Sequence, residues 1–147
     1  MKRIALGAGL LLAILSVTAC GGSSTTSPTT TAVTPTTEFF SGTLSPKGSS
    51  FYSFTATTTG ALSVTLASTT TSKIGPAITA KLTIGLGAPS GFGCAVTSSV
   101  DATPGLSAQL SNSSLTADSN GSIYCIRVSD PGQLTSDVLF VIRIVHS

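Results

Sequence analysis

The chain has little charge and few of the side chains that carry out chemistry. Only 8% of its 147 residues are charged, and it has a single histidine and no tryptophan. So few cations exclude the basic patch that a nucleic-acid-binding protein needs. The scarce carboxylates and the lone histidine also leave little material for acid–base or metal chemistry. The composition therefore indicates no enzyme, no cofactor, no metal site and no nucleic-acid partner.

The amino-terminal residues have the pattern of an export signal. Met1-Lys2-Arg3 is a short positive start, and residues 4–17 form an apolar run interrupted only by two glycines and a serine. A membrane-spanning helix needs about 20 apolar residues, so this run is too short to be one. It predicts a secretory signal peptide over residues 1–19.

The end of this signal is the most specific motif in the chain. Val17-Thr18-Ala19-Cys20 resembles the lipobox of bacterial lipoproteins. The resemblance implies cleavage before Cys20, a diacylglycerol on its thiol and fatty acids such as palmitate at the new amino terminus. It also implies a lipid anchor in the bacterial cell envelope, and in the outer membrane if the host has one, because Gly21 follows the cysteine. The alternative is an ordinary secreted protein with a chance cysteine.

The residues after Cys20 predict a tether. Residues 20–37 consist of the lipidated cysteine and the sequence GGSSTTSPTTTAVTPTT, which is rich in serine, threonine and proline. Such a segment buries too little apolar surface to offset the entropy of ordering it. Removing residues 1–19 also takes Lys2 and Arg3 away, which leaves five basic and five acidic residues. The exported chain is thus neutral, which gives no support for long-range electrostatic steering.

Residues 38–147 predict an all-β domain. Apolar residues alternate with polar ones, which is typical of strands with one buried face. Turn signals such as Asn120-Gly121 separate these segments, and no stretch has helical spacing. About eight short strands at regular intervals favour an antiparallel β-sandwich of jelly-roll type. The five strongest segments are 51–56, 62–66, 82–86, 124–128 and 140–144, and weaker ones lie at 39–44, 93–97 and 106–110.

Two of these stretches together resemble a known family. FYSFTATTTGALSVTL (residues 51–66) and GSIYCIRVSDPGQLTSDVLFVIRIV (residues 121–145) are similar to the pre-peptidase C-terminal (PPC) domain, a secreted bacterial β-sandwich of jelly-roll type. The resemblance implies a non-catalytic accessory module. It also implies that some relatives bind calcium through clustered acidic residues.

The two cysteines that remain after Cys20 predict a disulfide. Cys94 and Cys125 form an even pair in an exported chain, where disulfides form and persist. The alternative is two buried free thiols. A zinc site is disfavoured, because zinc takes four ligands and His146 is the only other soft candidate.

Three further places carry weaker candidates. Asp118 and Asn120 have the alternating oxygens of a calcium loop, although Asn120-Gly121 is also a tight-turn signal. His146 is a candidate catalytic residue of a hydrolase, set against an ordinary exposed strand end. Phe51 and Phe92 are candidates for stacking on sugars. Phe51 lies on the strand face opposite Tyr52 and Phe54, and the alternative for it is burial under a loop or the opposite edge.

These observations favour a lipid-anchored, non-catalytic β-sandwich that contacts another envelope or extracellular protein. Hydroxyl-rich outer faces and open strand edges are suited to such contacts. A glycan-binding module is the alternative, and a hydrolase is the third possibility.

Overall fold

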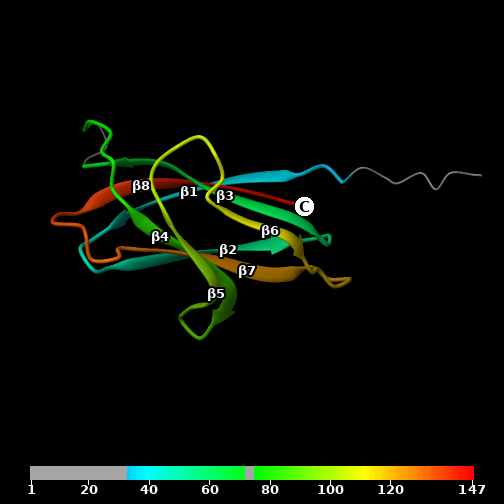
Figure 1. Cartoon of the computed structure of the whole chain (residues 1–147). Coiled ribbons are helices and arrows are strands. Elements are labelled where there is room, and N and C mark those ends of the chain that lie inside the picture. The colour runs from blue at the N-terminus through cyan, green and yellow to red at the C-terminus, as the bar shows by residue number, and fades with distance from the viewer. Residues whose placement is uncertain (1–32, 72–74) are drawn as a thin grey trace, which may run out of the picture. The chain divides into compact units, whose positions relative to one another are not determined.

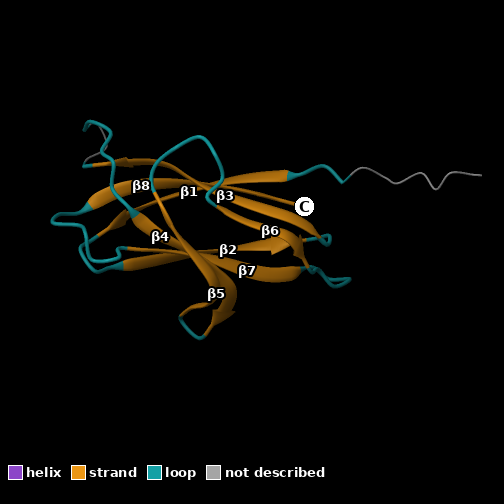
Figure 2. Cartoon of the chain, in the orientation of Figure 1, coloured by secondary structure: helices purple, strands orange, loops and turns teal. Residues whose placement is uncertain are grey.

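Residues 33–71 and 75–147 are described by a computed structural model, and they form two packed β-sheets (Figure 1). Figure 2 shows strands and loops and no helix in this part of the chain, so it contains no helix that could cross a membrane. The predicted signal peptide (1–19), Cys20 and the tether up to residue 32 lie outside the described residues. The all-β sandwich predicted from the alternation is confirmed.

Eight antiparallel strands make up the two sheets. The first sheet has the order β1-β8-β3-β6, and the second sheet has the order β2-β7-β4-β5. In chain order the strands are β1 (Thr36–Leu44), β2 (Ser49–Ala56), β3 (Gly60–Thr70), β4 (Leu82–Ser90), β5 (Gly93–Ala102), β6 (Leu110–Leu115), β7 (Ser122–Ser129) and β8 (Val138–His146).

The order of the strands is that of a jelly roll. Every connection between consecutive strands passes from one sheet to the other, except the β4–β5 hairpin. This interleaving of two four-stranded sheets is the double Greek key of the jelly-roll fold. The jelly-roll type predicted from the sequence is therefore confirmed.

The core lies between the two sheets and follows the period of two in the sequence. Along β8, residues alternate strictly between buried and half-buried, with Phe140, Ile142 and Ile144 fully buried. Successive side chains of a strand point to opposite faces, so a single apolar stripe on each strand suffices to fill the interior. In β3, Leu62 and Val64 point inward and are buried in the same way. From the second sheet, the ring of Tyr52 packs edge-on against Phe140.

Most strands are longer than the segments predicted for them, and two differences change the assignment of a segment. β1 begins at Thr36, which pairs with His146, so the sheet includes the last two residues assigned to the tether. The strand predicted over 106–110 is wrong: β6 begins at Leu110, and Leu106 is 95% exposed in the preceding loop. In that loop, the backbone amides of Gly105 and Gln109 donate hydrogen bonds to carbonyl oxygens of β3, without forming a regular strand pairing.

Asp130 organises the loop that joins β7 to β8. One of its carboxylate oxygens accepts hydrogen bonds from the backbone amides of Gly132, Gln133 and Leu134, and the other accepts one from the amide of Lys47 in the β1–β2 loop. Partial desolvation raises the pKa of this carboxyl, but the four amide donors together lower it by more. The pKa therefore lies below its ordinary value.

The lowered pKa of Asp130 predicts an acid-sensitive contribution to stability. A carboxyl whose pKa is lower in the folded state stabilises the fold above its unfolded pKa of about 3.9, and this contribution is lost as the pH falls through the folded pKa. We expect Asp130→Asn to lower the thermal midpoint at pH 7. The difference in thermal midpoint between the variant and the unchanged protein should shrink as the pH falls below about 3.9. A difference that stays constant with pH would contradict this account.

Candidate functional site

The outward face of the second sheet carries two adjoining hollows that share Arg127. One hollow, of about 300 Å³, is lined by the start of β2, by Phe92 and Cys94 at the tip of the β4–β5 hairpin, and by Arg127. The other, of about 160 Å³, lies between β7, β4 and β5. We call these two hollows together the Arg127 groove. Its remaining lining residues are Ser49, Ser50, Phe51 and Gly93 on one side and Thr83, Gly85, Val96, Ser99 and Ser129 on the other.

The groove exists partly because β4 presents glycines on its outward face. Gly85 lies directly opposite Arg127 in the β4–β7 ladder, and Gly87 lies opposite Cys125. A Cβ atom at Gly85 would meet the methyl groups of Val96 at 2.7 and 2.9 Å, and one at Gly87 would overlap the backbone of β5. These two positions therefore need the smallest residue, and β4 forms a low floor between its two neighbouring strands.

The two phenylalanines singled out from the sequence lie in the same hollow. Phe51 is the cross-strand partner of Arg127 in the β2–β7 ladder, and its side chain is 41% exposed, as the alternation predicted. Phe92 occupies the tip of the β4–β5 hairpin and is fully exposed. In Figure 1 this tip projects outward beyond the β2–β7 pair. The structure thus brings both rings beside one cation, and ligand binding by them stays a prediction.

The predicted disulfide is confirmed and supports this site. Cys94 and Cys125 are bonded, with Cα atoms 5.9 Å apart. Cys94 lies two residues after Phe92, and Cys125 lies two residues before Arg127. The bond joins β5 to β7 across the intervening strand β4. It therefore ties the hairpin that carries Phe92 to the strand that carries Arg127.

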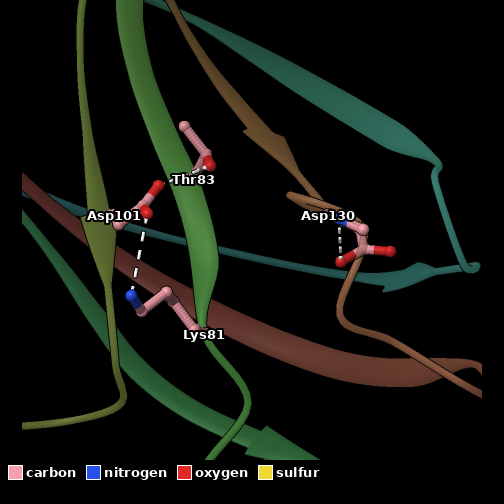
Figure 3. A network of polar contacts seen from close by, with 5 residues as sticks. Lys81, Thr83, Asp101 and Asp130 are labelled. Carbon is pink, nitrogen blue, oxygen red and sulfur yellow. Dashed lines mark hydrogen bonds and ion pairs between the residues drawn. The ribbon is translucent and has the colours of Figure 1, made fainter.

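Arg127 is the cation of the groove, and no acidic group lies beside it. Its cross-strand partners on the two adjacent strands are Phe51 and Gly85. In the same sheet, Asp101 on β5 accepts a hydrogen bond from Thr83 and forms an ion pair with Lys81 at 3.8 Å (Figure 3). In the part of the chain that the structure describes, an ion pair joins Lys81 to Asp101, and the only other close contact between a basic and an acidic side chain is that of His146 with Glu38. The guanidinium therefore has no ion-pair partner there.

His146 is not the exposed strand end expected from the sequence. It is 4% exposed, and its ring packs on Phe54 with centroids 4.9 Å apart. Its Nε2 lies 2.9 Å from a carboxylate oxygen of Glu38, and its Nδ1 lies 3.2 Å from the carbonyl oxygen of Ser147. The expectation was wrong because His146 continues the buried stripe of β8, and Phe54 of the second sheet covers it. Neither partner is a hydroxyl nucleophile, so this arrangement is not the triad that a hydrolase would need.

Asp118 and Asn120 form a turn. The Asp118 carboxylate accepts a hydrogen bond from the amide of Asn120, and the Asp118 carbonyl accepts one from Gly121 at a φ of 82°. This geometry is an Asx-type turn, in which the side chain replaces a backbone acceptor. No group of three or more histidine, cysteine, aspartate or glutamate residues that could hold a metal ion occurs in residues 33–71 and 75–147.

Neither a protein-family model nor a curated protein sequence matches the chain. The site must therefore be interpreted from its own residues. Arg127 is the residue of the groove that was not predicted from the sequence. Its position between Ile126 and Val128, both buried, placed it on the outward face. The ladder that sets it opposite Phe51, however, joins segments 76 residues apart and is not readable from the sequence.

Proposed function

We propose that this chain is an exported, lipid-anchored, non-catalytic binding module of the bacterial envelope. The export signal and lipobox-like motif that end at Cys20 support the anchor, and the PPC-like stretches support an accessory role. In this role the domain takes a segment of another envelope protein as an added strand at β5. The observation that carries this is the open edge of that strand.

β5 is the longest of the four edge strands, and it pairs only with β4. From Gly93 to Val100 it contains no charged residue and no proline, and residues 95–99 are all exposed. Natural proteins commonly protect such edges with charges, prolines or short length. Apart from a bulge at Thr97, the eight residues from Gly93 to Val100 form an edge without these protections. Such an edge is suited to β-strand addition, in which backbone hydrogen bonds supply the affinity.

A charged residue on this edge tests the proposal. We expect Ser98→Lys to abolish cross-linking in cells between a photoreactive residue at Ala95 and its envelope partner, because a lysine on the edge opposes strand pairing. The matched control is Ser113→Lys on β6, the exposed edge of the first sheet, which should leave the cross-link unchanged. Equal loss in both variants, or no loss in either, would count against strand addition at β5.

A second candidate function, glycan binding, is favoured by one specific observation. Phe51 and Phe92 line the same hollow together with serine hydroxyls. Exposed aromatic faces pack against the apolar faces of sugars, while hydroxyls supply hydrogen bonds. This site lies on the face of the second sheet and is separate from strand addition at its edge.

A further inference from the structure

We propose that the Arg127 groove binds a glycan that carries carboxylate groups, such as a chain of uronic acids. This rests on the second candidate function and adds the charge of the ligand. In the complex, the guanidinium of Arg127 pairs with a sugar carboxylate, and the rings of Phe51 and Phe92 pack against the sugar faces.

The first argument is that the positive charge of Arg127 has no carboxylate partner in the groove. Arg127 is exposed, and its ladder neighbours are a phenylalanine and a glycine. Asp101, on β5 beyond the intervening strand β4, already contacts Lys81 and Thr83. A planar guanidinium binds carboxylates through two parallel hydrogen bonds. A ligand with a carboxylate beside its apolar face complements this site better than a neutral sugar does.

The second argument is that the groove offers side chains rather than backbone. Its floor is formed by β7 and β4, which are each paired on both sides within the sheet. A peptide strand would find no open backbone there, whereas β5 offers one. The groove instead presents hydroxyl groups on both sides of Arg127, from Ser49 and Ser50 on one side and from Thr83, Ser99 and Ser129 on the other. These groups both donate and accept hydrogen bonds, as a polyhydroxylated ligand requires.

The third argument is that the backbone carrying the two aromatic residues is held in place. The tip carrying Phe92 is fixed to β7 by the Cys94–Cys125 bond, and Phe51 lies within a paired strand. An exposed ring on a rigid backbone loses less conformational freedom on binding, which favours affinity. The fully exposed Phe92 therefore has a use that folding alone does not supply.

The first sheet supplies matched controls for Arg127 and Phe51. Arg143 lies opposite Phe39 in the β1–β8 ladder, as Arg127 lies opposite Phe51. Phe39 is exposed, and together with Leu106 and Arg143 it lines a hollow of about 220 Å³. Ala67 and Gly105 and the buried Thr65 complete that hollow, so it has no comparable set of exposed hydroxyls.

The test is calorimetric titration of the purified exported chain with a short oligogalacturonate and with its fully methyl-esterified form. We expect saturable binding of the acid and at least about tenfold weaker binding of the ester, which has lost the carboxylate charge. Arg127→Gln should weaken acid binding by about tenfold or more, and Phe51→Ala or Phe92→Ala by roughly three- to tenfold. Arg143→Gln and Phe39→Ala should leave it unchanged.

Three results would overturn the proposal in distinguishable ways. Equal binding of acid and ester would leave glycan binding in place and remove the carboxylate specificity. Binding of neither compound, with strand addition at β5 intact, would remove both the glycan function and this inference. Equally tight binding of dextran sulfate that is lost in Arg143→Gln as readily as in Arg127→Gln would indicate unspecific attraction of polyanions.

Discussion

Replacing both disulfide cysteines with alanine should lower the free energy of unfolding by about 3–4 kcal/mol. The bond closes a loop with a sequence separation of 31 residues, and a cross-link of that length removes this much loop entropy from the unfolded chain. The variant is Cys94→Ala/Cys125→Ala in a Cys20→Ser background. With a slope of about 1.5 kcal/mol per M, the urea midpoint should fall by roughly 2–3 M.

The control for this experiment is the Cys20→Ser protein itself, measured with and without a reductant. The reduced control should unfold at nearly the same urea concentration as the double alanine variant, because both lack the cross-link. The double alanine variant should not respond to the reductant at all. If the oxidised and reduced controls unfold together, the bond does not stabilise the chain in the way proposed.

If Cys20 carries the proposed lipid, Cys20→Ser should abolish lipidation completely. A hydroxyl does not replace the thiolate nucleophile in forming the thioether, and stable anchoring requires more than one acyl chain. In cells grown with an alkyne-tagged fatty acid, we expect incorporation into the chain to fall to background. The exported domain should also leave the membrane fraction.

The matched control is the Cys94→Ala/Cys125→Ala variant, which loses two cysteines outside the lipobox-like motif and should keep the fatty acid label. Full labelling of Cys20→Ser would show that the lipid is attached elsewhere. Absence of label in the unchanged protein would favour the alternative of an ordinary secreted chain.

Local pattern determined the strands, whereas their arrangement in the sheets depends on distant pairings. The alternation around Phe140, Ile142 and Ile144 was enough to predict β8 and its buried face. Every second side chain of a strand points to the same side, so alternating apolar residues line one face. No local signal indicates that β8 pairs with both β1 and β3. The segment 106–110 was misassigned because its apolar residues alternate, although Leu106 points to solvent and Gln109 bonds to β3.

The candidate site was predictable only where the alternation within one strand shows whether a side chain points inward or outward. Phe51 was placed outward correctly, since its neighbours in β2 have the opposite orientation. The Cys94–Cys125 pair followed once Cys20 had been assigned to the lipid. Arg127 and His146 were missed or misjudged because their surroundings come from other strands. Glu38, the partner of His146, is 108 residues away in sequence.

The position of β8 also has a consequence for when the domain folds. β1 and β3 are separated in the first sheet by β8, the last strand of the described chain, so neither can complete its pairing until that strand arrives. Folds dominated by such non-local pairings form slowly, in about milliseconds to seconds. If the chain is exported amino terminus first, as proposed, its first sheet would therefore remain incomplete until nearly all of the chain has crossed the membrane.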